Sequence, residues 1–448
     1  MSGGPMANRF KRLIHFDEVV PRILRNVGVL VSGTAIVSLL GIVTLAIIAR
    51  ALGPAGVGIF ALVEAYVRTI DMLTRFQPTQ AIIKYASAAA EQGDRDRFAR
   101  LIKFSILVDL AGGALAGTIA IALGWGAARL LDLGSDGVGY IMFVSVALFV
   151  SFRPTGIAVL RLLDRFDLLA KADVGVAVMR LTIAAVALLL DLGIWAFMVI
   201  LLLQSLADGI VAFVLAMREL SRQGYDGIWR ASARSAAAEN PGLLRFLWNS
   251  NINQILRQSI LRFDVLALGA LVGPSSVGLY EVAKRSGKSI LRLARTITQV
   301  LFPELARLWV RGEQARFRRI IWRVSAMTLT VSMVLFVPLA FAMPTIVKVV
   351  FGPEFAGAVP LILLFGVSII VQITGLPFNP ALFSIGRDRE LLWITIFATI
   401  LFALAFYPAV MLFSAIGAVL CHLLFSIIWF IGCLWLLRAT PLPEEAHP

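Results

Sequence analysis

Charged residues are scarce in this chain, and hydrophobic residues make up most of it. Of its 448 residues, 15% are charged and 59% are hydrophobic, and the mean hydropathy is +0.88. Charged residues make up about 25% of an ordinary soluble globular protein. The composition therefore excludes a soluble globular protein and predicts an all-α, polytopic membrane protein.

Negative charge is scarcer than positive charge. The sequence has 41 Lys and Arg residues against 27 Asp and Glu residues, which gives a net charge of +14. In a soluble protein such an excess would suggest nucleic acid as a partner, but in a membrane protein basic residues first report the orientation of the helices. We therefore expect no nucleic-acid partner.

Cysteine and histidine are nearly absent. Cys421 and Cys433 lie on one expected helix, roughly 18 Å apart along its axis, so they cannot pair with each other. The three histidines, His15, His422 and His447, have neither the spacing nor the acidic or Cys neighbours of a metal site. We therefore expect no metal and no cofactor.

Apolar runs of spanning length recur along the whole sequence. The first run follows a basic segment of 26 residues, so no cleavable signal is expected. With about 20 residues per crossing, and with a break near Pro408, we expect twelve transmembrane helices, at residues 27–49, 56–83, 101–124, 137–160, 172–190, 193–217, 243–270, 276–302, 318–343, 356–385, 389–408 and 412–437.

The basic residues divide unevenly between the two sides of the membrane. If the N-terminus is cytoplasmic, the inner segments hold 27 of the 41 Lys and Arg residues, whereas the outer segments hold only Arg50, Arg129 and Lys348. This asymmetry follows the positive-inside rule and predicts that both termini are cytoplasmic. Most of the net charge therefore orients the chain.

A repeat divides the chain into two halves. Residues 52–60 recur as residues 272–280, 220 positions later, and both segments contain a Gly-Pro pair in an expected outer turn. Residues 93–100 recur in the same order as residues 312–319. Two halves of six helices enter the membrane in the same sense, so we expect a pseudo-two-fold axis along the membrane normal and a central cavity between two lobes.

This repeat sets the expected domain organisation. The segments are a cytoplasmic amphipathic N-terminal segment (1–26), an N-lobe of helices 1–6 (27–217), a cytoplasmic linker (218–242), a C-lobe of helices 7–12 (243–437) and a cytoplasmic tail (438–448).

The positive-inside rule does not explain the charged residues that lie within the expected helices. The expected helices contain eleven cations and six acids, and facing lipid these seventeen groups would cost on the order of 40–60 kcal/mol. They must therefore pair or line water. The cations are Arg68, Arg75, Arg153, Arg180, Arg257, Arg262, Lys284, Arg285, Lys288, Arg292 and Arg295; the acids are Glu64, Asp71, Asp109, Asp208, Asp264 and Glu281.

The spacing of these groups predicts charged helix faces. In the first half the face alternates in sign, and helical spacing allows Glu64 to pair with Arg68 and Asp71 with Arg75. The equivalent face of the second half is cationic, and there Glu281 can pair with Lys284 or Arg285. Two interpretations remain open: salt bridges between the lobes, or a site where five surplus cations bind an anionic ligand.

The chain resembles a known family of transporters. The resemblance rests on the twelve helices in two halves, on residues 49–53 with Gly58, and on the inner-loop pattern of residues 311–319. These features resemble the polysaccharide biosynthesis (O-antigen type) lipid-linked oligosaccharide flippases of the multidrug/oligosaccharidyl-lipid/polysaccharide superfamily. The resemblance implies a multi-pass protein of the bacterial inner membrane that translocates a polyprenyl-pyrophosphate-linked oligosaccharide by alternating access. Whether an ion or proton gradient drives this transport stays open.

A diphosphate ligand fits the cationic face, because phosphate oxygens bind Arg and Lys. The implied partners are membrane lipid, the lipid-linked glycan, a polysaccharide polymerase and glycosyltransferases, and we expect a monomer. Acids among these cations are candidates for ion or proton coupling. The candidate substrate-binding residues are Arg68, Arg75, Arg257, Lys284, Lys288, Arg292 and Arg295, and the candidate coupling residues are Glu64, Asp71 and Asp264.

Two other function classes stay open at this stage. A multidrug/cation antiporter of the same superfamily shares the arrangement of helices, although a cationic cavity would repel its substrates. A membrane glycosyltransferase or polymerase needs paired carboxylates or a metal site in a polar segment. The longest polar segment holds Glu219, Asp226 and Glu239 without such a motif, so we expect a transporter and not an enzyme.

Overall fold

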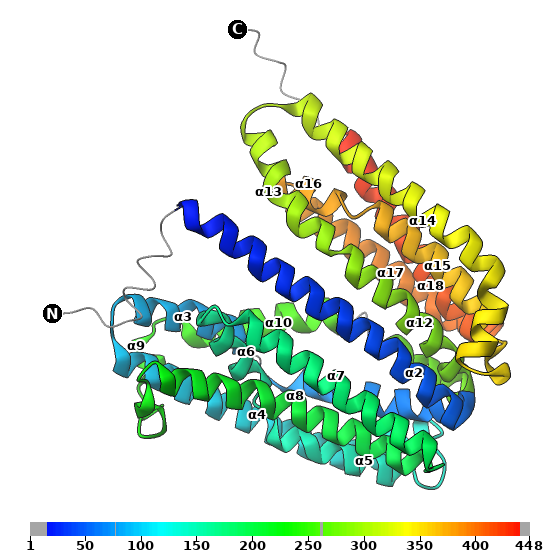
Figure 1. The fold of residues 1–448 in the computed structure, drawn as a ribbon, viewed down its shortest axis with the longest axis horizontal. Helices are drawn as coiled ribbons and strands as arrows, with labels where there is room; N and C mark the ends of the chain where they lie inside the picture. Colours follow the sequence, from blue (N-terminus) through cyan, green and yellow to red (C-terminus); the bar gives the residue numbers. More distant parts are fainter. Residues whose placement is uncertain (1–15, 77, 260–262, 440–448) are drawn as a thin grey trace. The chain divides into compact units, whose positions relative to one another are not determined.

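The computed structural model describes residues 16–76, 78–259 and 263–439. Within these ranges the regular structure is entirely helical, which confirms the predicted all-α class (Figure 1). Nine helical segments in the described part of the chain are long and apolar enough to cross a membrane. The contacts divide the chain into a first unit, Met1–Thr44 with Leu62–Leu266, and a second unit, Leu45–Ala61 with Ala267–Pro448. The predicted lobe boundaries stay a prediction.

The first two predicted helices follow each other without a loop. Helix α2 runs from Phe16 to Thr74, and at Gly53 its backbone leaves the helical conformation with φ 63° and ψ −178°. A positive φ of this kind is open to glycine because glycine has no Cβ. The predicted second helix is broken, since the chain resumes as α3 (Thr79–Glu91) only after Pro78, which has no N–H group to continue the helical hydrogen bonds.

The remaining helices of the first unit pack around a core built mainly from α3, α4, α6 and α8. Small alanines such as Ala86, Ala89 and Ala158 are fully buried there and let the helices approach closely. The elements are α4 (Arg95–Leu130), α5 (Gly137–Ser145), η1 (Val146–Val150), α6 (Arg153–Leu162), α7 (Phe166–Leu189), α8 (Ile194–Arg222), η2 (Asp226–Trp229), α9 (Ala236–Glu239), α10 (Leu243–Ser259) and α11 (Phe263–Val272), which extends into the second unit.

The fourth predicted helix is discontinuous. Helix α5 passes into the 3₁₀ helix η1, the backbone becomes extended at Ser151 (φ −115°, ψ 111°), and α6 starts at Arg153. Pro154 fits the first turn of a helix but not a helix interior, which accounts for a new start at this point. The break frees carbonyl and N–H groups that must find partners inside the protein, because lipid offers none.

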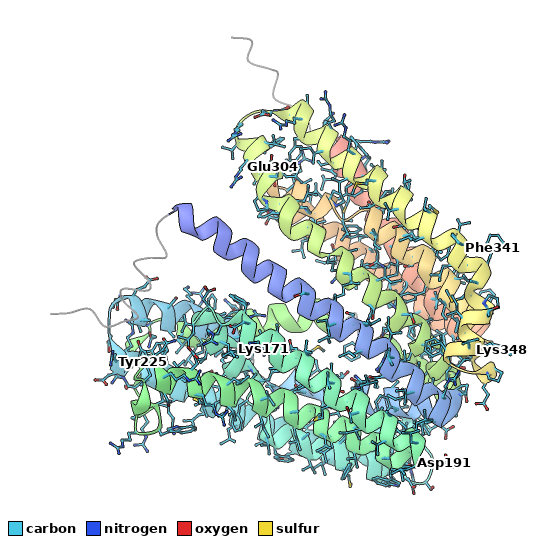
Figure 2. All side chains as sticks on the ribbon, in the orientation of Figure 1. Lys171, Asp191, Tyr225, Glu304, Phe341 and Lys348 are labelled. Carbon is cyan, nitrogen blue, oxygen red and sulfur yellow. The ribbon has the colours of Figure 1, made fainter. Side chains whose placement is uncertain are left out.

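The second unit contains the remaining long helices, with a core shared by α13, α14, α16 and α18. Exposed apolar side chains such as Phe341 project from α14, as expected of a lipid-facing helix (Figure 2). The elements are α12 (Pro274–Ala294), α13 (Thr296–Val310), α14 (Gln314–Val350), η3 (Pro353–Phe355), α15 (Ala358–Thr374), α16 (Phe378–Ser384), α17 (Asp388–Phe413) and α18 (Ala415–Arg438).

One predicted boundary is wrong. The break between the last two helices lies at Ser414, where φ is 52°, and not near Pro408, which is inside α17. A proline can stay inside a membrane helix when its surroundings satisfy the freed backbone groups. The chain therefore turns about six residues later than the position of the proline suggested.

The two Gly-Pro pairs of the repeat meet inside the second unit. Gly58 of α2 lies against the carbonyl group of Pro274, and Gly278 of α12 lies against the carbonyl group of Pro54. The two contacts are equivalent, because Gly278 and Pro274 occupy the same positions in the second repeat as Gly58 and Pro54 in the first. Gly273 also has the same type of backbone conformation as Gly53, with φ 80° and ψ 173°. A pseudo-two-fold relation between these two segments requires this reciprocity, and the contacts give the Gly-Pro pairs a structural role in the second unit.

Candidate functional site

The charged face of α2 consists of two ion pairs that differ in burial. Arg68 Nε lies 2.9 Å from a carboxylate oxygen of Glu64, and Arg75 Nε lies 2.5 Å from Asp71 Oδ1, so both predicted pairs form. Arg68 keeps 43% of its side chain exposed, whereas Arg75 keeps 2%. The first pair therefore lies at a surface of its unit, whereas in the second pair the arginine is buried and Asp71 stays 33% exposed.

Arg75 holds the discontinuous fourth span together. Its Nη1 donates to the carbonyl of Ser151 at 2.6 Å, and its Nη2 donates to the carbonyl of Leu148 at 3.0 Å. These carbonyls belong to the end of η1, where a cation is stabilised by the helix dipole. Gly112 and Gly113 of α4 provide the space, since a Cβ on either would touch the Arg75 side chain. With all three guanidinium nitrogens engaged, we propose that Arg75 is a structural residue and leave it out of the substrate-binding set.

A second cation fixes the other side of the same break. Arg153, at the start of α6, lies 2.9 Å from Asp208 of α8 and 3.0 Å from Asp173 of α7. This three-helix network uses three of the charged residues in the spans. The charges of the first unit therefore serve largely to join its own helices.

The predicted cationic face of the second half lies on α12. Lys284 is 3% exposed and its Nζ lies 5.3 Å from the ring centroid of Tyr280, a cation–π distance. Lys288 is half-buried, and Arg292 and Arg295 are exposed. One turn apart on a helix, the first three residues share one face. Burial decreases along this face from Lys284 to Arg292, so the cations become more accessible toward the expected inner end.

One acid on α12 is not available to neutralise these cations. Glu281 lies 2.7 Å from Arg285 Nε, which confirms that Glu281 pairs within its own helix. Arg292 and Arg295 form no ion pair with any residue that the structure describes. The positive charges of Arg292 and Arg295 are therefore not neutralised by an ion pair within the described part of the chain.

A buried polar network joins α12, α15 and α18. The Tyr280 hydroxyl lies 2.8 Å from His422 Nε2 of α18. Ser426 of α18 lies 2.8 Å from Ser368 of α15, and the Gln372 amide donates to Ser426 at 3.0 Å. His422 therefore contributes to the packing between α12, α15 and α18. The network positions the ring on which Lys284 lies.

Two further predicted site residues are only partly described. Asp264, in the first turn of α11, is 2% exposed and accepts a hydrogen bond of 2.8 Å from the backbone N–H of Val265. Arg257 belongs to α10, but its side chain lies outside what the structure describes. The coupling role of Asp264 and the binding role of Arg257 stay predictions.

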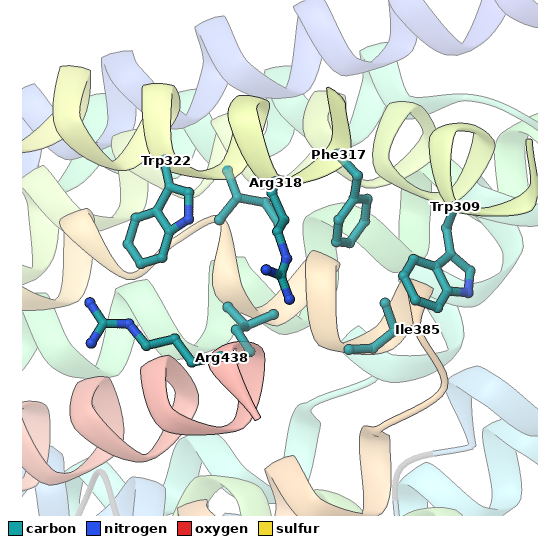
Figure 3. A pocket seen from close by; sticks show the side chains of 8 residues that line it. Trp309, Phe317, Arg318, Trp322, Ile385 and Arg438 are labelled. Atoms are coloured by element: carbon teal, nitrogen blue, oxygen red, sulfur yellow. The ribbon is translucent and has the colours of Figure 1, made fainter. Parts of the chain in front are cut away.

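A pocket of about 50 Å³ lies between α13, α14 and α18, lined by aromatic and basic side chains (Figure 3). Trp309, Trp322 and Arg318 contribute to its wall, and Arg438 lies 5.9 Å from the Trp322 ring centroid. Trp and Arg at one end of a helix bundle are typical of a membrane interface. Within the described ranges, no group of three His, Cys, Asp or Glu residues could hold a metal ion.

One ion pair and two hydrogen bonds to an asparagine hold the linker between residues 218 and 242 against α4. Arg100 Nε donates to Glu239 of α9 at 2.7 Å, and Arg97 donates to the side chain of Asn240 at 2.7 and 3.0 Å. Hydrogen bonds from Arg100 and Ser235 hold the pKa of Glu239 below its ordinary value. Glu239 and Asn240 therefore hold the linker against α4.

Comparisons with known proteins agree on the class of molecule. The chain is 26% identical over 294 residues to the inner membrane protein YghQ of Escherichia coli K12, a match that covers 65% of this chain and 82% of that protein. Among solved structures, it is similar to the lipid II flippase MurJ in an inward closed conformation, with a TM-score of 0.70, 11% identity, and coverage of 92% and 88% of the two chains.

It is also similar to an inward-facing multidrug resistance MATE family transporter of the MOP superfamily, with a TM-score of 0.65, 14% identity, and coverage of 94% and 96%. At such identities these two structures show the fold of a multi-pass membrane transporter. The family described as polysaccharide biosynthesis protein matches residues 23–309, well over half of the chain. The chain therefore belongs to the family of polysaccharide biosynthesis proteins.

Proposed function

We propose that this protein is a flippase that translocates a polyprenyl-diphosphate-linked oligosaccharide across the bacterial inner membrane by alternating access. The observation that carries the proposal is the cationic face of α12, formed by Lys284, Lys288 and Arg292, in a member of the polysaccharide biosynthesis family. MurJ, which has the same fold, is named as a flippase of lipid II.

The chemistry of α12 suits a diphosphate. Glu281 is engaged by Arg285, so an anionic ligand would supply the charge that the exposed cations of α12 require. Lys288 and Arg292 are the accessible members and would contact the phosphates, whereas Lys284 lies deeper on the Tyr280 ring. We retain Arg68, Arg257 and Arg295 as further contacts of the diphosphate or sugar.

A multidrug/cation antiporter is the second candidate, because a MATE transporter shares the fold. The charge of α12 argues against it, since a cationic face repels a cationic drug. An enzyme is a weaker candidate, because two carboxylates of the longest polar segment are engaged in ion pairs, Glu219 with Arg165 and Glu239 with Arg100. Glycosyltransferases and a polysaccharide polymerase would act before and after the flippase as functional partners.

The orientation forms part of the proposal. Both termini would be cytoplasmic, because that choice places most Lys and Arg in the inner segments. The two sugar-processing steps would then lie on opposite sides of the membrane. Glu64, Asp71 and Asp264 remain the predicted coupling residues for an ion or proton gradient.

The test is transport by purified protein in proteoliposomes that contain a polyprenyl-diphosphate-linked sugar. We expect Lys288→Gln and Arg292→Gln to lose transport while protein level and membrane insertion stay normal. Arg311→Gln is the matched control, because Arg311 is an exposed cation in the turn between α13 and α14. If the Lys288 and Arg292 variants transport at the wild-type rate, the cationic face is structural and the proposed site is wrong.

A further inference from the structure

One carboxyl group of the first unit is buried without a matching cation. Asp109, in the middle of α4, is 0% exposed. Its Oδ2 accepts a hydrogen bond of 3.0 Å from the backbone N–H of Thr155, and its Oδ1 has no hydrogen-bond partner among the described residues. The other acids predicted to lie within the spans of this unit and described with ion-pair partners, Glu64, Asp71 and Asp208, each have an arginine.

The carboxyl group of Asp109 has a structural role at the start of α6. Thr155 is the third residue of α6, the helix that starts in the break of the fourth span. The residue before α6 is Phe152, which has no polar side chain to cap the helix, and Pro154 has no N–H. Asp109 caps this helix from α4, and the positive end of the helix dipole favours an acid at this position.

The nearest cation is already engaged. Arg75 and Asp71 are the charges that act on Asp109, but the three guanidinium nitrogens of Arg75 donate to Asp71, Leu148 and Ser151. Since Arg75 and Asp71 neutralise each other, an ionised Asp109 would leave this cluster with one negative charge.

The other elements packed against α4 offer no replacement. Helix α5 and η1 contain no Lys or Arg, and Arg153 of α6 is paired with Asp173 and Asp208. Helix α2 reaches α4 through Tyr66, and its Glu64 and Arg68 pair with each other. The remaining cations on the elements around α4 are Lys84 of α3 and Arg161 of α6, and neither is among the charges that act on Asp109. The other titratable groups there are Tyr85, Glu91, Tyr140 and Glu239.

We propose that Asp109 is a proton-binding site whose occupancy sets the contact between α4 and α6 during transport. A proton from the aqueous phase binds to Oδ1, which converts the carboxylate to a neutral carboxylic acid and leaves the cluster without net charge. Oδ2 keeps its hydrogen bond to Thr155 in both states. The bond is stronger in the ionised state, because a charged acceptor binds an N–H group more strongly than a neutral one.

The proton can influence the rest of the first unit through α6. Loss of the proton tightens the cap on Thr155, and α6 also holds Arg153, which joins α7 and α8. Proton binding therefore changes how firmly the broken span is held. The link to transport rests on the proposed flippase function, whereas the proton site itself depends only on the geometry of the first unit.

The experiment is infrared difference spectroscopy of the full chain in lipid nanodiscs during a pH titration. We expect the carbonyl-stretch band of a buried carboxylic acid to appear as the pH falls, and Asp109→Asn to abolish it. Asn keeps an oxygen that can accept from Thr155, so this variant should fold. Asp173→Asn is the matched control, because Asp173 is a paired and partly exposed acid of the same unit, and it should keep the band.

Two results would overturn the proposal. If Asp109→Asn retains the full band, another group binds the proton. If the wild type shows no titrating band over the pH range in which it stays folded, Asp109 does not exchange a proton. Neither result involves transport, so failure of the proton site and failure of the flippase function can be told apart.

Discussion

The role of Arg75 leads to a stability prediction with an internal control. Replacement of Arg75 by Leu leaves the carbonyls of Leu148 and Ser151 without their donor and Asp71 without its cation. An unsatisfied buried polar group costs about 1–3 kcal/mol, and removal of one partner of a buried ion pair costs about 3–5 kcal/mol. These terms overlap and Asp71 is 33% exposed, so we expect a total loss of about 3–5 kcal/mol.

Arg68→Leu is the control for this prediction. Arg68 lies on the same helix and, like Arg75, pairs with an acid four residues before it, but 43% of its side chain is exposed. An exposed ion pair contributes at most about 1 kcal/mol. Both variants would be unfolded in mixed micelles of increasing SDS content and followed by circular dichroism. Equal losses for the two variants would refute the assigned role of Arg75 in the broken span.

Three further predictions follow from individual contacts. Gly278→Val should destabilise the second unit, because a side chain there meets the carbonyl of Pro54; a thermal midpoint equal to that of the wild type would contradict the reciprocal packing. Tyr280→Phe should cost about 1–3 kcal/mol, because His422 Nε2 loses its partner, and the same change in a His422→Phe background should cost less. Glu239 has a lowered pKa in the folded state, so its pair with Arg100 contributes stability above the ordinary carboxyl pKa of about 4.3 that is lost as the pH falls. The difference in thermal midpoint between the wild type and Glu239→Gln should therefore be constant near neutral pH and disappear in acid; a difference independent of pH would contradict it.

Hydropathy and helical spacing predicted much of the fold. The long apolar runs predicted the helices, and spacing of four residues predicted the pairs of Arg68 and Arg75. For Glu281 helical spacing allowed Lys284 or Arg285, and the structure shows the pair with Arg285. The repeat predicted the equivalent Gly-Pro segments, because a positive φ and a close helix approach both require glycine. Such signals are local in sequence, and a single chain displays them directly.

The contacts that decide the role of each charge are not local. Arg75 bonds to carbonyls more than 70 positions away, and Asp109 caps a helix that starts 44 positions later. The sequence predicted that both residues lie in the membrane. It could not show that the fourth span breaks near Ser151, where both residues make their contacts. Pro154 was the available signal for that break, since a proline marks the first turn of a helix more often than its interior.

The most direct test of the central claim is a comparison of substrates with the wild-type protein. Proteoliposomes would contain a fluorescent polyprenyl-diphosphate-linked oligosaccharide, and a membrane-impermeant quencher would report its appearance in the opposite leaflet. A lipophilic cation would be assayed in parallel vesicles. We expect movement of the lipid-linked sugar and no transport of the cation. Transport of the cation without movement of the lipid-linked sugar would contradict the proposed function.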